Sequence, residues 1–155
     1  MSRSSRSLEY KTDGQICSMR KAGLVVAAIH AALREEVRAG VTTRRMDELA
    51  REVLEAHGAR SNFYGYYGYP AQICVSVNEE IVHGIPGERV LEAGDLVSFD
   101  CGAVLDGWHG DAAFSVAVPG KDAPARRRLC EIAEASMWHG IAAMATGGRV
   151  GDIGR

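Results

Sequence analysis

Two carboxylates on the two arms of a predicted hairpin are the side chains whose types and spacing most favour chemistry. Asp106-Gly107 is a strong two-residue turn signal, and pairing of Leu105 with Trp108 across it sets the hairpin register. In that register Asp100 and Asp111 share one sheet face as diagonal neighbours, roughly 7–8 Å apart at the backbone. Because like charges so placed repel, one divalent cation, or two that share a carboxylate, would stabilise them. The pair predicts a metal site, and two solvated hairpin acids are the alternative.

The opposite face of the same hairpin is apolar and supports this register. A slip of one residue would turn an aspartate into the core, because side chains alternate between the two faces of a sheet. The residues predicted to face the core are Val97, Phe99, Cys101, Ala112, Phe114 and Val116.

Two paired helices are predicted ahead of the hairpin. Thr12 opens the first with capping-box spacing, and helical apolar spacing continues until Gly40. The second follows residues 42–43 and ends at Gly58, with Asp47 in an early turn where the helix dipole favours acids. The apolar positions that define the first helix are Ile16, Met19, Gly23, Val26, Leu33 and Val37.

A shaped loop, three strands and a third helix complete the predicted elements. Residues 61–70 are rich in Tyr, Gly, Phe and Asn, which is typical of a shaped loop. The third helix runs from Pro124 to Gly147-Gly148 and aligns weakly with the first, while residues 150–155 align with the opening of the second. The expected strands span residues 73–77, 95–104 and 108–118.

The composition is that of one ordinary globular domain. Of the 155 residues, 46% are hydrophobic and 25% charged, which is enough for one core. A net charge of -2 and a pI near 6.2 argue against nucleic acid as a partner. We expect residues 1–7 to be a disordered tail and residues 8–155 to form the domain. Neither a secretory signal nor a membrane span is recognised, so a cytoplasmic protein without a membrane contact is predicted.

Three blocks of this sequence resemble, in order and spacing, the signature blocks of type I methionine aminopeptidases. They cover residues 76–86, 94–102 and 106–111, and the likeness extends from about Leu8 to the last residue. The resemblance implies an α+β pita-bread (aminopeptidase/creatinase-like) fold, with the first pseudo-symmetric half and the start of the second in this chain. It also implies removal of the initiator methionine from nascent polypeptides with a small second residue. The complete enzyme would be a monomer, with the ribosome as a further candidate partner.

The resemblance also assigns roles to individual residues. Asp100 would be a metal ligand and Asp111 would bridge two divalent ions, whose identity among Mn, Fe, Co and Zn stays open. His83 would be catalytic, contacting the substrate near the scissile amide; outside this motif it would be an ordinary surface histidine. The residues that would line the pocket for the methionine side chain are Phe63, Tyr66, Tyr69 and Cys74. His83 would bind the substrate too, and plain core packing is the alternative for the pocket residues.

The chain departs from the family's pattern in two respects. Tyr67 stands where the family usually has histidine, which puts a hydrogen-bonding role at that position in doubt. The family's complete metal site also uses residues of a second half, so we expect the 155 residues alone to bind metal weakly and to show little or no peptidase activity. The competing hypotheses are a related proline-type metallopeptidase and a non-catalytic pita-bread module that binds a partner.

Overall fold

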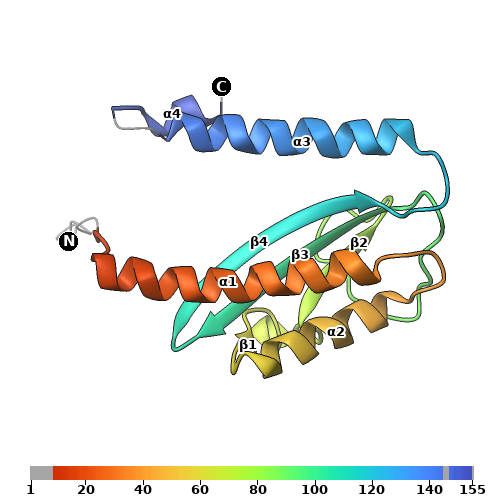
Figure 1. The fold of residues 1–155 in the computed structure, drawn as a ribbon, viewed down its shortest axis with the longest axis horizontal. Helices are drawn as coiled ribbons and strands as arrows, with labels where there is room; N and C mark the ends of the chain where they lie inside the picture. The colour runs from red at the N-terminus through yellow and green to blue at the C-terminus, as the bar shows by residue number, and fades with distance from the viewer. Residues whose placement is uncertain (1–8, 145–146, 155) are drawn as a thin grey trace, which may run out of the picture.

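A four-stranded antiparallel sheet organises the fold, and two helices cover one of its faces (Figure 1). The computed structural model describes residues 9–144 and 147–154, so the tail predicted for residues 1–7 lies outside the described part. β3 (Leu96–Leu105) is the central strand. It pairs with β4 (Trp108–Ala117) along one side, and with β1 (Arg60–Ser61) and β2 (Ile73–Val77) along the other.

The hairpin of β3 and β4 has the predicted register. Leu105 pairs with Trp108, and the turn residues Asp106 and Gly107 have φ angles of 50° and 81°, as a tight hairpin turn requires. The predicted core positions on β3 are buried, whereas those on β4 are half-buried at Phe114 and Val116 and exposed at Ala112. The prediction was therefore wrong for Ala112, because β4 is an edge strand and Ala112 borders an open hollow between α1 and α3.

Helix α1 (Asp13–Glu36) begins as predicted and ends earlier than predicted. The Thr12 side chain accepts a hydrogen bond from the Gln15 amide, and the Gln15 side chain accepts one from the Thr12 amide. The helix stops at Glu36 and not at Gly40, because Val37 is already extended. Its buried residues are Ala22, Val25, Val26, Ile29 and Leu33, whereas the predicted positions Ile16, Met19 and Gly23 are exposed. The first turns of α1 project beyond the hairpin tip, so no sheet covers them (Figure 1).

By length and composition, α1 would also qualify as a membrane span. An 18-residue window within it has a mean hydropathy of 1.4. The prediction that no window approaches a membrane span therefore did not account for the length and hydropathy of this helix. In this fold the buried apolar residues of α1, among them Val26, Ile29 and Leu33, pack in the core with β3 and β4.

Helix α2 (Thr43–Ala56) packs beside α1 and closes the core. Thr42 caps it by accepting the Arg45 amide, and Gly58, with a φ angle of 63°, lies just past its end, as predicted. Met46 and Leu54 are buried against the same core as Phe99, the largest fully buried side chain. The two helices thus form the predicted pair and hold the sheet from one side.

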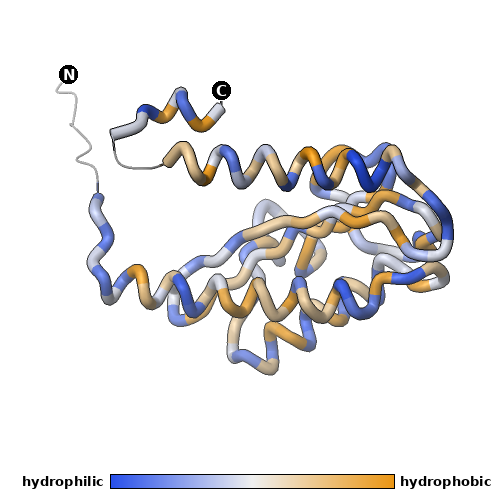
Figure 2. The backbone as a smooth tube through the Cα atoms, turned by 45° about the horizontal axis from the view of Figure 1, so that its top comes forward, coloured by the Kyte–Doolittle hydropathy of each residue, from blue (hydrophilic) through white to orange (hydrophobic). Residues whose placement is uncertain are grey.

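Two further elements follow the sheet. Helix α3 (Pro124–Ala143) starts at Pro124 as predicted, stops short of the predicted Gly147-Gly148, and has no buried residue. The hydropathy pattern shows apolar residues along α3 and the short helix α4 (Val150–Ile153), as along the core helices (Figure 2). The helical turn at α4 agrees with the predicted likeness of residues 150–155 to the opening of the second helix.

Candidate metal and substrate site

The hairpin register brings Asp100 and Asp111 to the sheet face opposite the helices. Asp100 pairs with Ala113 and Asp111 with Gly102, so the two carboxylates are diagonal neighbours on adjacent strands. Cys74 lies directly opposite Asp100 on β2. Three adjacent strands therefore each contribute one titratable side chain to the same face, as the sequence predicted for the two acids.

The electrostatics of Asp100 reflect this gathering of groups. Burial raises the pKa of its carboxyl, the charge of Asp111 raises it further, and His83 acts in the opposite direction. Asp111 is exposed and lies on the solvent side of the pair. A half-buried carboxylate beside a second one is a position where a bound cation is favoured, because it removes the repulsion between them.

His83 reaches this face through a strained backbone tied to β2. Its φ angle of 58° is left-handed, which is uncommon outside glycine and often found at functional sites. The next residue, Gly84, accepts a hydrogen bond from the Val75 amide at 2.9 Å and donates one to Ser76 Oγ at 3.1 Å. A Cβ on Gly84 would lie 2.2 Å from the Val75 oxygen, so only glycine permits this approach.

Tyr69 and Cys74 form a neutral wall beside the acids. The Tyr69 hydroxyl lies within hydrogen-bonding distance of two carbonyl oxygens, Ile73 at 3.1 Å and Gly84 at 3.0 Å. Burial is the main cause that raises the pKa of the Tyr69 phenol and of the Cys74 thiol. Both groups are therefore protonated at neutral pH, and they present an uncharged, polarizable surface.

The other predicted pocket residues lie on the aromatic loop, defined as residues 62–71. Phe63 is half-buried at the start of the loop. Tyr66 is 66% exposed and packs its ring edge against Tyr67, which is 94% exposed and has a left-handed φ angle of 46°. The structure thus brings Tyr69 and Cys74 to the acids and leaves Tyr66 at the exposed tip of the loop.

Asp47 is a residue near this site whose contacts the sequence interpretation did not predict. It lies in an early turn of α2, as predicted, and its half-buried side chain accepts the Gln72 amide at 2.7 Å and the Ile73 amide at 3.0 Å. Burial raises the pKa of Asp47, and the two amide hydrogen bonds act against that rise. The partners lie 25 and 26 residues away, so no local signal could have shown the contact.

The three cysteines outside the site differ in their burial. Cys101 is buried on the helix side of β3, and burial raises the pKa of its thiol. Cys17 is exposed on the projecting part of α1, and Cys130 is half-buried on α3. Of these three thiols, only that of Cys101 belongs to the hydrophobic core.

The donor set on this face suits part of a divalent-metal site. Carboxylate oxygens are ligands for hard and borderline divalent ions. The charge of Asp111 raises the pKa of Asp100, and a bound ion would offset this repulsion between the two carboxylates. Within residues 9–144 and 147–154, no three His, Cys, Asp or Glu side chains are grouped closely enough to hold an ion. Asp100 and Asp111 are the two carboxylates that this face offers to such an ion.

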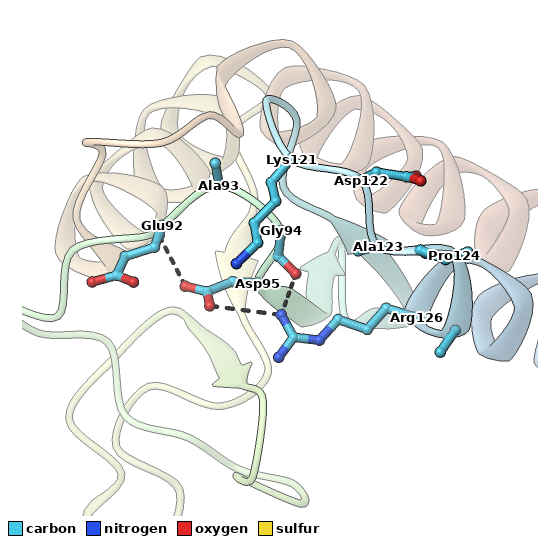
Figure 3. A pocket seen from close by; sticks show the side chains of 10 residues that line it. Glu92, Ala93, Gly94, Asp95, Lys121, Asp122, Ala123, Pro124 and Arg126 are labelled. Atoms are coloured by element: carbon cyan, nitrogen blue, oxygen red, sulfur yellow. Dashed lines mark hydrogen bonds and ion pairs between the residues drawn. The ribbon is translucent and has the colours of Figure 1, made fainter.

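Two hollows lie on other parts of the molecule. One, of about 420 Å³, separates the turn at residues 92–95 from the start of α3 (Figure 3). There Arg126 donates to the Gly94 carbonyl and lies 3.9 Å from Asp95, so these charges compensate each other. The other, of about 430 Å³, lies between α1, β4 and α3 and includes Phe114 and Met137. Neither hollow is lined by Asp100 or Asp111. We favour the face that carries these two aspartates as the functional site, because their charges are not balanced by an arginine as that of Asp95 is.

Comparison with known protein families and curated sequences gives consistent relatives. The family model described as Metallopeptidase family M24 matches residues 17–155. Methionine aminopeptidase 1 of Mycobacterium tuberculosis is 46% identical over 152 residues, which are 97% of this chain and 57% of that protein. Methionine aminopeptidase 1 of Bacillus subtilis is 41% identical over 143 residues, 92% of this chain and 57% of that protein. The chain thus spans a little over half the length of these curated relatives.

Solved structures share the fold. A methionine aminopeptidase from Thermotoga maritima has a TM-score of 0.83 at 35% identity, covering 90% of this chain and 55% of that one. A methionine aminopeptidase from Streptococci has a TM-score of 0.89 at 25% identity, covering 96% of this chain and 64% of that one. A Glu-to-Ala variant of Escherichia coli aminopeptidase P has a TM-score of 0.74 at 27% identity, covering 86% and 29%. The α+β pita-bread fold expected from the sequence is confirmed.

Proposed function

Because this chain belongs to Metallopeptidase family M24, we propose that its protein removes the N-terminal methionine from polypeptides with a small second residue. The observation that carries the proposal is the gathering of Asp100, Asp111 and Cys74 on one sheet face, with His83 acting on Asp100. The names and identities of the curated relatives support the same reaction. The cytoplasm, where nascent chains begin, is the proposed location, and the ribosome is a proposed partner.

The metal requirement rests on the two aspartates. We propose that Asp100 and Asp111 are ligands of two divalent ions in the whole protein, with Asp111 shared between them. When bound, such ions supply electrophilic activation of the scissile carbonyl and of the attacking water. Among the described residues no third ligand is grouped with these two carboxylates. The 155 residues by themselves are therefore proposed to bind metal weakly and to turn over little substrate, since catalytic metal sites usually have three protein ligands.

The remaining residues bind and orient the substrate. His83, held by its strained backbone and the Gly84 contacts, would donate a hydrogen bond near the scissile amide. Tyr69 and Cys74 would contact the methionine thioether, because sulfur and ring edges attract one another and both groups are neutral. Phe63 and Tyr66 would close the pocket from the aromatic loop. Tyr67 is exposed and would contribute no proton at this site.

The test combines metal binding with turnover. Mn²⁺ binding to this chain is measured by electron paramagnetic resonance, beside release of methionine from a Met-Ala-Ser peptide. Asp111→Asn should weaken Mn²⁺ binding at least tenfold, because it removes a charged ligand. Asp106→Asn, a change of equal charge in the hairpin turn, should leave binding unaltered. Equal Mn²⁺ affinity in the parent and Asp111→Asn would show that the acids are not the metal site.

A proline-type peptidase is the second candidate, because aminopeptidase P has a similar fold. The same assay with an Ala-Pro-Ser peptide separates the two. Binding or turnover of Met-Ala-Ser and not of Ala-Pro-Ser supports the methionine reaction, and the reverse preference supports the proline reaction. Turnover by the 155 residues that Asp111→Asn abolishes would confirm the ligand and contradict the proposal that these residues alone are weakly active.

A further inference from the structure

The aromatic loop is held at its neck, which we define as Ser61 and Gln72, and its tip at Tyr66 and Tyr67 is exposed. Ser61 is buried at the end of β1, and Gln72 immediately precedes β2. Ser61 Oγ donates to the Gln72 carbonyl at 2.6 Å and accepts the Phe63 amide at 2.9 Å. One hydroxyl therefore joins the outgoing and returning ends of the loop.

The second attachment of the neck comes from helix α2. A single oxygen of Asp47, Oδ1, accepts the Gln72 amide at 2.7 Å and the Ile73 amide at 3.0 Å. The helix is a rigid base for this carboxylate, because Met46 and Ala50, on either side of it along the helix, are fully buried. Gln72 is thus held at its carbonyl by Ser61 and at its amide by Asp47, which fixes the position of its peptide units on both sides.

The held residues lead directly to the candidate pocket wall. Ile73 opens β2, and its carbonyl is one of the two that Tyr69 OH can reach. Cys74 follows and faces Asp100. Holding the neck therefore sets the depth of Cys74 and Tyr69 relative to the acids, whereas the exposed tip at Tyr66 makes no such contact.

We propose that Asp47 is a positioning residue that, together with Ser61, clamps the neck of the aromatic loop and so holds Tyr69 and Cys74 in the shape that accepts a methionine side chain. The identity of that ligand rests on the proposed function. The placement of the clamp rests only on the contacts of Asp47 and Ser61. The carboxylate acts through the backbone of Gln72 and Ile73 and does not touch the substrate.

The experiment follows alkylation of Cys74 by iodoacetamide, a neutral probe, in the 155-residue chain by peptide-resolved mass spectrometry. Asp47→Ala removes the acceptor, and Asp47→Asn keeps an Oδ1 acceptor while removing the charge. Alkylation of Cys74 should be about tenfold faster in Asp47→Ala than in Asp47→Asn, because loss of the clamp lets the neck open locally. Asp47→Asn should stay within about twofold of the parent, and Glu48→Gln, the neighbouring acid, serves as the matched control.

Cys101 distinguishes positioning from plain stability. It is fully buried in the adjacent strand, so it is alkylated only when the whole sheet opens. A clamp predicts faster alkylation of Cys74 alone, whereas a general loss of stability would accelerate both thiols equally. Equal rates for Cys74 in the parent, Asp47→Asn and Asp47→Ala would overturn the proposal, and so would equal acceleration of both thiols.

Free L-methionine separates the clamp from the proposed function. It should slow Cys74 alkylation in the parent and in Asp47→Asn but not in Asp47→Ala. Absence of protection in the parent would contradict the methionine pocket, while the relative alkylation rates without ligand still test the clamp.

If Asp47→Ala fails to fold, hydrogen exchange in the parent tests the clamp instead. Gln72 and Ile73 amides should exchange as slowly as the Val75 amide, and exchange as fast as the amide of the exposed Val82 would refute the clamp.

Discussion

At the scale of single residues, the acidic pair predicts effects of opposite sign with and without metal. Asp100→Asn removes one of two repelling charges and the penalty of burying it, so without metal it should raise the free energy of unfolding by about 0.5 kcal/mol. With Mn²⁺ the parent should gain stability and the variant should not, because only the parent keeps both ligands. Urea unfolding with chelator and with Mn²⁺ measures both effects, and Asp106→Asn is the control. A variant that Mn²⁺ stabilises as much as the parent would contradict the ligand assignment.

His30 predicts how the stability of this chain depends on pH. Burial lowers the pKa of His30 below its ordinary value of 6.5; its hydrogen bond to the Ala112 carbonyl opposes this shift, and Arg34 adds to it. The unfolded chain therefore takes up a proton that the folded chain resists. Stability is lost as pH falls below about 6.5, and none is lost above it.

The variant His30→Gln should lose this part of the pH dependence. Urea unfolding at pH 7.5, 6.5 and 5.5 should give a smaller fall in stability for His30→Gln than for the parent. Glu134 and Cys130 line the same hollow from α3. The comparison is made at equal ionic strength, so that the charge of Glu134 is screened equally in the parent and the variant. His139→Gln, on the exposed α3, is the matched control variant. An unchanged slope in His30→Gln would refute this assignment.

At the scale of elements, two glycines at the contact of α1 with β4 should respond to the same substitution in opposite ways. A Cβ on Gly110 would lie 2.7 Å from the Ala22 carbonyl and the Gly23 amide, so Gly110→Ala must push α1 off the sheet. We expect a loss of about 1–3 kcal/mol in the free energy of unfolding. Gly23→Ala meets no atom within 4 Å and should stabilise α1 by about 0.5–1 kcal/mol. Thermal and urea unfolding of both variants test this, and a tolerated Gly110→Ala would contradict the close approach.

At the scale of the whole molecule, α3 presents an apolar surface without cover in the described structure. Leu129, Ile132 and Trp138 are each about half exposed, as are other large side chains of this helix. We predict concentration-dependent self-association of the 155-residue chain at about 100 µM, because exposed apolar surface of this kind drives contact.

Substitution on α3 should remove that association without loss of stability. Ile132→Glu and Trp138→Glu should each lower the mass-average molar mass measured by light scattering, with the free energy of unfolding changed by less than about 0.5 kcal/mol. Ala27→Glu, on the exposed side of α1, adds the same charge and should not change association. A parent that remains monomeric at this concentration would contradict the role given to α3.

The local elements were predictable because their signals are local. The Thr12 cap, the turn at Asp106-Gly107 and the bounds of β2 each depend on a few adjacent residues whose backbone preferences agree with the fold. The hairpin register followed from alternation of side chains, which allowed Asp100 and Asp111 to be placed together before any tertiary contact was known.

The tertiary structure alone decided which predicted residues meet. Asp47 and Gln72, or Tyr69 and Gly84, are joined across loops whose ends carry no shared pattern. Likewise, periodicity marked Ile16 and Leu33 as equals, yet the sheet covers only the second. The sequence by itself determined the elements and the acidic pair, because these depend on neighbours along the chain. Burial and the clamped loop depend on how far one packed element extends over another, and only the folded arrangement sets that distance.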